Sequence, residues 1–470
     1  MKSYEEFLRS IPQKSCIDET HDFLGEISRK QELNAFITLN EENAVCAAAE
    51  SDVRFADGRP RSLEGMIVAL KDNIATAGIR TTCASKMLEN YVPVSNASVA
   101  DSLRESGAVV IGKTNMDEFA MGSSNENSVF GAVAHPLNAD YVPGGSSGGS
   151  AVAVAAGMAH AALGTDTGGS VRQPAAFCGV VGFKPSYGRI SRSGVVAFAS
   201  SFDQIGIFAP DVYSTARIFD AVSGRDRRDS TTADLPPAQS FDTVRRPLPE
   251  HFTVATLPDD QLEGCDEDVM CVYRRSLEIW LSAGAKIMTA TIPHSEAWIP
   301  AYYVLATAEA SSNLARFDGI RYGCRVAGDY DDITVASRSQ GFGAEVKRRI
   351  MLGTYVLSSG YYDSYFGKAQ RARRLIYDGY ASIFEKADIL FLPTTPTPAF
   401  RRGEKINDPV AMYLSDYFTV SANLAGIPAV SVPAGESAGG MPVGMQLQAR
   451  RYDDERLLQF ARCFQESAKI

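Results

Sequence analysis

Short runs of apolar and β-branched residues recur along the chain from about residue 60 onward, with helical patterns between them. Runs of this length and composition are typical of strands buried inside a sheet. Strands that alternate with helices predict a mixed α/β fold in which helices cover a buried β-sheet. The predicted strands are 66–70, 108–111, 205–208, 252–255, 389–392 and 429–432.

Other stretches have the periodicity or the composition of helices. Residues 1–60 predict a helical N-terminal layer, and the alanine-rich stretch 150–164 predicts a buried helix too short to span a bilayer. Residues 298–386 predict a helix-rich layer that folds back over the sheet. The stretch 453–467 predicts a final helix that packs through its apolar face.

The composition is that of an ordinary soluble globular protein, with 45% hydrophobic and 22% charged residues in a chain of 470. The net charge of −10 argues against a chain that binds nucleic acid by itself, so any contact with RNA is expected to be made by a partner. The eight cysteines are scattered without close pairs, which predicts neither a metal site nor a redox centre. The charged, amphipathic start is unlike a signal peptide and predicts a cytoplasmic location with no membrane partner.

Two clusters of glycine and serine carry the candidate chemistry, PGGSSGGS at 143–150 and TDTGGSVR at 165–172. Glycine-rich turns let backbone N–H groups converge on one point while a hydroxyl is presented beside them. Acyl transfer needs this combination for its nucleophile and its oxyanion. Ser170 is therefore a candidate nucleophile, and the N–H groups of Thr167, Gly168, Gly169 and Ser170 are candidates for the oxyanion pocket.

A serine nucleophile needs a neighbouring base, and none of the five histidines lies in a motif that would supply one. Lys71, at the end of the predicted strand 66–70, can serve as this base if burial lowers its pKa. A lysine at the end of a strand is more often simply solvated, so this assignment depends on its surroundings.

The two clusters, together with VALKDN at 68–73, resemble the amidase signature family, and Ser146 and Ser170 stand 24 positions apart, as in that family. The resemblance implies the family fold, a large mixed central sheet with helices on both faces. It also implies that Ser170 is the nucleophile, that Ser146 passes its proton to Lys71, and that the peptide bond between Gly145 and Ser146 is cis. Asp166 and Arg172 would support the nucleophile's loop through a salt bridge, and Ser147 would be a structural hydrogen-bonding residue.

Within this family, the stretches 116–122, 310–323 and 345–354 resemble the A subunits of glutamine-dependent aminoacyl-tRNA amidotransferases. That resemblance implies that Arg349 and Asp416 bind the α-carboxylate and the α-amino group of free glutamine, with Tyr302 nearby. The alternative is that Arg349 belongs to a solvated basic helix face with its neighbours Lys347 and Arg348, and that Asp416 is a surface carboxylate.

The function implied by the resemblance is hydrolysis of glutamine to glutamate and ammonia. The ammonia would be passed to a tRNA-binding B subunit that uses ATP and Mg²⁺ to convert Glu-tRNA(Gln), Asp-tRNA(Asn) or both, with a small C subunit completing a heterotrimer. No metal or cofactor is expected on this chain. The alternatives are a stand-alone amidase that acts on small amides and a non-catalytic scaffold subunit.

A third alternative comes from GAVVIGKT at 107–114, which matches the P-loop pattern of nucleotide-binding proteins. Its middle residues form an apolar β-branched run, which suits a strand rather than a phosphate-binding loop. We therefore predict a strand and a turn here.

The chain is predicted to form one domain, 1–470, because no repeat or low-complexity segment divides it. Within it, the N-terminal layer at 1–60 precedes a catalytic region at 61–222 and a helix-rich, substrate-binding remainder at 251–470. The polar stretch 223–250 is either a connection between the two halves or a plain surface loop, and we favour the loop.

Overall fold

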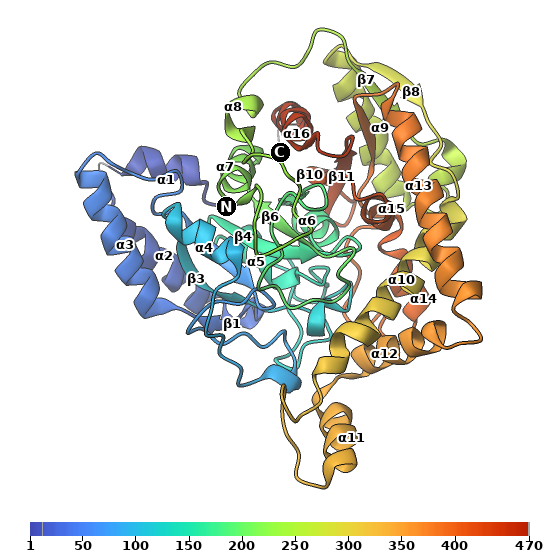
Figure 1. The fold of residues 1–470 in the computed structure, drawn as a ribbon. Coiled ribbons are helices and arrows are strands. Elements are labelled where there is room, and N and C mark those ends of the chain that lie inside the picture. The colour runs from blue at the N-terminus through green and yellow to red at the C-terminus, as the bar shows by residue number, and fades with distance from the viewer. Residues whose placement is uncertain (12, 469–470) are drawn as a thin grey trace.

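The computed structural model describes residues 1–11 and 13–468, and its centre is one sheet of eleven strands (Figure 1). The strands are β1 (Phe36–Leu39), β2 (Ile67–Lys71), β3 (Val109–Thr114), β4 (Ala161–Asp166), β5 (Val181–Lys184), β6 (Gln204–Ala209), β7 (Thr253–Thr256), β8 (Lys286–Thr289), β9 (Ile389–Pro393), β10 (Ala429–Glu436) and β11 (Pro442–Gln448).

Helices of very different lengths surround this sheet. They are α1 (Tyr4–Ser10), α2 (Cys16–Arg29), α3 (Glu41–Ala56), α4 (Ser98–Glu105), α5 (Gly148–Ala155), α6 (Arg172–Cys178), α7 (Val212–Val222), α8 (Ser240–Val244), α9 (Glu267–Ser282), α10 (Trp298–Asn313), α11 (Tyr330–Gly341), α12 (Ala344–Leu357), α13 (Lys368–Phe384), α14 (Pro409–Leu414), α15 (Tyr417–Ala425) and α16 (Asp454–Ala468).

The strand order is β1-β3-β2-β4-β6-β5-β10-β11-β9-β7-β8. Strand β2 runs parallel to β3 and β4, and β7 runs parallel to β8 and β9, whereas the other neighbours are antiparallel. The predicted mixed sheet is therefore confirmed. The pairing of β5 with β10 joins the two halves of the chain in one sheet, while the boundaries predicted for the segments stay a prediction.

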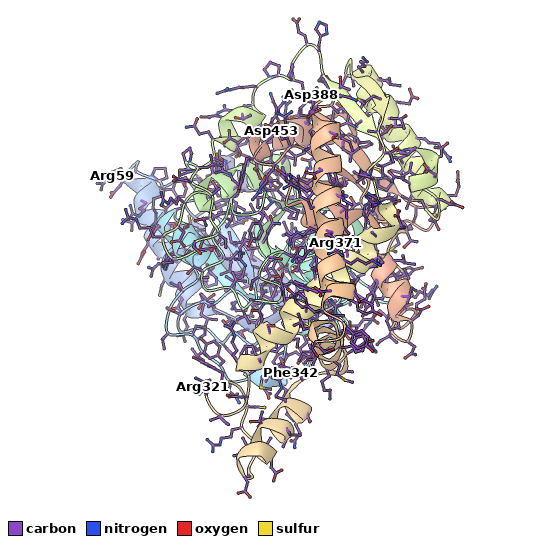
Figure 2. The ribbon with its side chains drawn as sticks, turned by 45° about the vertical axis from the view of Figure 1, so that its right-hand side comes forward. Arg59, Arg321, Phe342, Arg371, Asp388 and Asp453 are labelled. Carbon is purple, nitrogen blue, oxygen red and sulfur yellow. The ribbon has the colours of Figure 1, made fainter. Side chains whose placement is uncertain are left out.

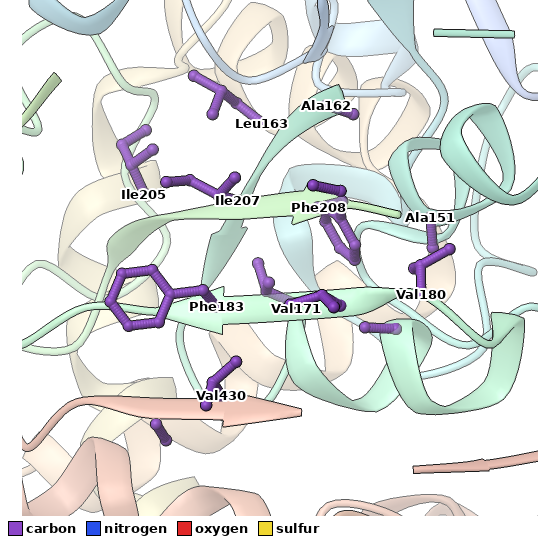
Figure 3. Close-up of a cluster of buried hydrophobic side chains, with 14 of the residues drawn as sticks. Ala151, Ala162, Leu163, Val171, Val180, Phe183, Ile205, Ile207, Phe208 and Val430 are labelled. Carbon is purple, nitrogen blue, oxygen red and sulfur yellow. The ribbon is translucent and has the colours of Figure 1, made fainter. Parts of the chain in front are cut away.

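Strand β5 shows how both faces of the sheet are covered. A side chain at Gly182 would overlap Ala175 of α6, so this face of the strand lies directly against that helix. The next residue, Phe183, points to the other face and packs edge-to-face against Phe219 of α7, with ring centroids 5.1 Å apart. Figure 3 shows Phe183 beside Val430 of the neighbouring strand β10, within the hydrophobic core between the layers.

All the strands predicted from the apolar runs are present, with boundaries shifted by a few residues at most. The prediction of one helix over 150–164 is wrong. Helix α5 ends at Ala155, because Gly157 adopts a φ of +71°, and residues 161–166 form the central strand β4. The N-terminal layer is also not wholly helical, since residues 36–39 form the edge strand β1.

Helices α10, α12 and α13 form the predicted helical layer on one side of the sheet (Figure 1). Figure 2 shows α13 along the outside of the molecule with Arg371 on it, and the projecting helix α11 near Arg321 and Phe342. Most of the polar stretch 223–250 is irregular, with only the short helix α8. Within residues 1–11 and 13–468, no helix combines the length and the apolar character needed to cross a membrane.

Residues 107–114 form strand β3 and the turn before it, as predicted, rather than a phosphate-binding loop. The Lys113 side chain is fully buried, donates a hydrogen bond to Thr81 Oγ1 at 2.6 Å and lies 3.4 Å from Asp72 Oδ1. This lysine is therefore occupied by an internal ion pair.

Candidate active site

Lys71, at the carboxyl end of strand β2, reaches the loop that begins helix α5. Its Nζ lies 2.8 Å from Ser146 Oγ, 2.8 Å from Ser147 Oγ and 3.4 Å from the Thr165 carbonyl oxygen. The Ser147 hydroxyl donates to the same Thr165 carbonyl at 3.2 Å, so it accepts from Lys71. In a neutral Lys71 the two N–H groups are then occupied, and the lone pair is left for the hydroxyl of Ser146.

The surroundings of Lys71 favour this neutral form. Its side chain is fully buried, and burial lowers its pKa from the ordinary lysine value to about 7, against the opposing charges of Asp117, Asp166 and Asp203. The alternative of a solvated lysine at the end of a strand is therefore wrong.

The peptide bond between Gly145 and Ser146 is cis, as the family resemblance implies. Two buried residues hold this turn. Gln173 Oε1 accepts a hydrogen bond from the Gly145 N–H at 3.0 Å, and the main-chain N–H of Asp117 donates to the carbonyl oxygen of Ser146 at 3.1 Å. Ser146 is thus fixed from both sides of its backbone.

Ser170 lies in the turn between β4 and α6, and 8% of it is exposed. Within the described part of the chain, its hydroxyl makes no hydrogen bond, not even to Ser146, whose hydroxyl contacts Lys71. The N–H groups of Thr167, Gly168 and Ser170 likewise have no acceptor among the described residues, whereas the N–H of Gly169 donates to Asp166 Oδ1 at 2.9 Å. Three of the four N–H groups predicted for the oxyanion pocket are therefore unoccupied, and the one from Gly169 is already used.

Both glycines in this turn are required by their surroundings. A side chain on Gly168 would overlap the ring of Tyr302 on helix α10. Gly169 has a φ of +136°, and a side chain there would overlap Thr419 of helix α15. The 167–170 turn is thereby packed directly against helices α10 and α15.

The predicted salt bridge between Asp166 and Arg172 is present and fully buried, with Arg172 Nη2 2.9 Å from Asp166 Oδ1. Burial alone would raise the pKa of Asp166, but the guanidinium lowers it to about 2. The remaining donors of Arg172 bond to the Thr419 carbonyl oxygen at 2.9 Å, to Gln446 Oε1 at 2.6 Å and to Asn423 Oδ1 at 2.5 Å. The ion pair ties the nucleophile's turn to the C-terminal part of the chain.

Arg349, on helix α12, is buried, whereas its neighbours Lys347 and Arg348 are exposed. The idea that it belongs to a solvated basic face is therefore wrong. Its guanidinium lies over the rings of Phe198, Tyr303 and Tyr413, with centroids 5.5, 5.3 and 5.6 Å away. Its Nε donates to Glu345 at 2.8 Å, and no residue of the described chain accepts from its two terminal nitrogens. A planar guanidinium with both terminal nitrogens available suits a carboxylate ligand.

Asp416, at the start of helix α15, is buried rather than on the surface. Its Oδ2 accepts a hydrogen bond from Ser123 Oγ at 2.5 Å, and its buried Oδ1 has no partner among the described residues. Burial raises the pKa of Asp416 to about 7, although the Ser123 hydrogen bond and the charge of Arg349 oppose this. An ammonium ligand at Oδ1 would satisfy the carboxylate and favour its ionised form.

The sequence did not single out several residues that complete this arrangement. Tyr303 and Tyr413 stack with ring centroids 3.8 Å apart and enclose Arg349, and Asp203 accepts from Thr167 Oγ1 at 2.8 Å. Asp117 and Gln173 hold the cis turn. Asp117 lies in the stretch 116–122 and Gln173 directly follows the cluster 165–172, but neither motif shows what these side chains contact, so only the three-dimensional structure identifies their roles.

Two cavities lie beside this centre. One of about 780 Å³ lies between the segments 86–91, 194–197 and 313–324, and Lys71, Ser146 and Ser170 do not line it. A smaller cavity of about 230 Å³ reaches Asp203, the partner of Thr167. Burial and geometry therefore identify the site better than the size of a cavity does. No cluster of three or more metal-binding side chains occurs in the described ranges.

Known proteins resemble this chain over nearly its whole length. Residues 18–458 match the family model described as Amidase. The chain is 48% identical over 470 residues to the A subunit of the glutamyl-tRNA(Gln) amidotransferase of Thermoanaerobacter pseudethanolicus, with 98% of this chain and 96% of that protein covered. It is 51% identical over 440 residues to the protein of the same name from Persephonella marina, with 91% and 89% covered.

Solved structures show the same similarity. The crystal structure of the glutamyl-tRNA(Gln) amidotransferase A subunit from Thermotoga maritima matches with a TM-score of 0.77 and 40% identity over 96% of this chain and 94% of that one. The native peptide amidase from Stenotrophomonas maltophilia matches with a TM-score of 0.83 and 28% identity over 99% and 96% of the two chains.

Proposed function

The chain belongs to the amidase family, and we propose that it is the glutamine-hydrolysing subunit of a tRNA-dependent amidotransferase. The relatives named as A subunits of such an amidotransferase, which match over nearly their full length, support this proposal. The observation that carries it is the combination of a buried Lys71–Ser146 pair with two buried, oppositely charged groups, Arg349 and Asp416, in one centre. Such a pair of charges matches the zwitterionic end of a free amino acid.

In the proposed reaction, Ser170 Oγ attacks the side-chain amide carbon of glutamine. Its proton passes through the Ser146 hydroxyl to the lone pair of neutral Lys71. The carbonyl oxygen becomes an oxyanion that accepts hydrogen bonds from the free N–H groups of the 167–170 turn.

Collapse of this intermediate breaks the carbon–nitrogen bond. Lys71 returns the proton through Ser146 to the leaving nitrogen, and ammonia departs. Water then attacks the acyl-enzyme ester and gives a proton through Ser146 to Lys71. The bond between the acyl carbon and Ser170 Oγ breaks, Lys71 returns the proton through Ser146 to Ser170 Oγ, and glutamate is released.

The clamp, formed by Arg349 and Asp416, determines which amide is hydrolysed. Arg349 would bind the α-carboxylate through its terminal nitrogens, and Asp416 Oδ1 would accept from the α-ammonium. Tyr302 packs against Gly168 of the oxyanion turn, so a ligand held between these groups is placed next to the reacting atoms.

The ammonia would serve a partner. We propose a tRNA-binding B subunit that uses ATP and Mg²⁺ to activate Glu-tRNA(Gln), Asp-tRNA(Asn) or both, together with a small C subunit in a cytoplasmic heterotrimer. The net charge of −10 on this chain is unfavourable for binding tRNA, which supports assigning tRNA binding to the partner.

The deciding experiment measures ammonia release from glutamine and from simple amides, by the chain and by its Ser170→Ala variant, with and without co-expressed B and C subunits. We expect release from glutamine that requires Ser170 and rises with the partners. A preference for simple amides regardless of partners would instead identify a stand-alone amidase. Failure of a sulfonyl fluoride to label Ser170 would favour a non-catalytic scaffold.

Replacing Arg349 by alanine separates glutamine recognition from amide chemistry. Because the carboxylate loses its buried partner, kcat/KM for glutamine should fall by about 10²-fold or more, while hydrolysis of a simple amide continues. The matched control is Lys347→Ala on the same helix, whose exposed side chain makes no contact with Glu345 or Arg349 among the described residues and should be dispensable. Equal loss of both substrates in Arg349→Ala would contradict the clamp.

A further inference from the structure

The carboxylate of Asp117 lies directly behind the turn that carries Ser146. Its side chain is fully buried, and its main-chain N–H donates to the carbonyl oxygen of Ser146 at 3.1 Å. Side chains added at Gly122 or Gly145 would overlap the Asp117 carboxylate, so the backbone is packed against it on two sides. Very little space is left for the carboxylate to move.

The same carboxylate organises the loop that follows it. Oδ2 accepts a hydrogen bond from the Asn125 N–H at 2.9 Å, and Oδ1 accepts one from the Asn127 N–H at 3.1 Å. Phe119, Ala120 and Asn125 in this loop have φ values of 50°, 62° and 62°, which are unfavourable for residues with a side chain. Strained backbone of this kind persists only where the surroundings impose it, and it concentrates at functional sites.

This loop also touches the other parts of the site. Ser123 donates to Asp416, and its carbonyl oxygen accepts from Gln173 Nε2 at 2.8 Å, while Gln173 Oε1 holds Gly145. Asn125 Oδ1 accepts from the N–H of Gly149, at the start of helix α5, at 3.3 Å. The loop therefore connects the turn of Ser146 to a charged group of the proposed clamp.

We propose that Asp117 is a positioning residue, which holds the backbone of Ser146 and the segment carrying Ser123 in one arrangement and places a negative charge beside Lys71. This inference rests on the proposed function for the hydrolysis of an amide by Ser170, Ser146 and Lys71. It does not require glutamine to be the substrate, because its evidence is the geometry around Ser146.

The charge on Asp117 gives this role a specific signature. After burial, the groups with the largest effect on the charge of Lys71 are Asp117, Asp166, Asp203 and Cys83, and the carboxylates favour the ammonium form of the lysine. Burial raises the pKa of Asp117 itself to about 6, so its carboxylate is mostly ionised at the pH where Lys71 loses its proton. Replacing Asp117 by asparagine removes one of these anions and keeps the shape of the side chain. The pKa of Lys71 must then fall, so the neutral, basic form persists to lower pH.

The test is the rate at which phenylmethanesulfonyl fluoride labels Ser170, measured against pH in the full chain and in Asp117→Asn. Because the amide group of asparagine cannot accept both N–H bonds, the plateau rate should fall about 10- to 100-fold. The midpoint of the rate against pH should also move to lower pH. A reduced plateau with an unchanged or higher midpoint would mean that Asp117 only supports the structure, and an unchanged plateau would equally overturn the proposal.

A matched control and a second variant keep the test interpretable. Asp454 is another buried carboxylate, which accepts from the N–H and hydroxyl of Ser186, and it is absent from the charges that act on Lys71. Asp454→Asn should leave the labelling midpoint unchanged. If Asp117→Asn does not fold, Asp117→Ser offers a smaller neutral side chain, with the same two changes expected. Absence of labelling in the unmodified chain would refute the proposed function, whereas normal labelling with an unshifted midpoint in the variant would refute only this inference.

Discussion

The lowered pKa of Lys71 comes from burial rather than from its neighbours in the sequence. A lysine at the end of a strand is ordinarily charged, but here desolvation lowers its pKa to about 7, and Ser147 and Thr165 occupy its donors. Ser146 is the one neighbour left for its lone pair. The motif in the sequence identifies Lys71, and its enclosure in the fold lowers its pKa.

This environment predicts the pH dependence of hydrolysis. Since the neutral amine is the active form and its pKa is lowered to about 7, the rate should rise through about pH 7 and be lost below it. The measurement is kcat/KM for glutamine across about pH 5 to 9. A rate that stays constant down to pH 5 would rule out Lys71 as the base.

Replacing Lys71 by arginine is a second test of its role as the base. Arginine keeps its proton throughout this range, so Lys71→Arg should lose about 10²–10⁴-fold in rate even at high pH. The exposed Lys86→Arg serves as a control and should keep full activity. Substantial recovery of Lys71→Arg activity at high pH would contradict the assignment.

Among the elements, six of the eleven strands in the described residues are predictable from apolar runs in the sequence, whereas β1, β4, β5, β8 and β11 are not. The sequence of strand β4 (AALGTD) predicts a helix because its small residues continue the composition of α5. The turns of the site were found through their glycines. Gln173 and Tyr303 are not identifiable from the sequence because their contacts come from distant residues, and Asp117 is not because its role depends on the fold of the loop that follows it.

The turn between β4 and α6 depends on the buried pair of Asp166 and Arg172. Replacing Arg172 by methionine leaves the Asp166 carboxylate without its counter-ion, so the free energy of unfolding should fall by about 3–5 kcal/mol. Urea titration measures this loss. The exposed pair of Arg225 and Asp234 is the comparison, since Arg225→Met should change stability by less than about 1 kcal/mol. Similar effects of the two substitutions would show that the buried pair has no special role.

At the scale of the whole molecule, one sheet contains both the strand that carries Lys71 and the strands of the C-terminal half. Arg172 reinforces this continuity through Asn423 and Gln446. Within the described residues, the sheet is therefore continuous from the strand that carries Lys71 to the strands of the C-terminal half. The site forms where the two halves meet.

A single sheet predicts one cooperative unfolding transition. Both tryptophans, Trp280 and Trp298, are buried in the C-terminal half, so their fluorescence reports on that half alone. Labelling of Ser170 by a sulfonyl fluoride reports on the other half. The native tryptophan fluorescence and the labelling of Ser170 should be lost at the same urea concentration. Loss of labelling well before the change in fluorescence would indicate two separately folding units.

The hydrogen bonds of Arg172 also determine when activity can arise during synthesis. Ser170 is synthesised well before Asn423 and Gln446, which accept hydrogen bonds from the arginine of the ion pair behind it. A nascent or truncated chain thus contains the nucleophile without the partners that shape its turn. We therefore expect a chain truncated before residue 423 to release no ammonia from an amide, although it contains Ser170.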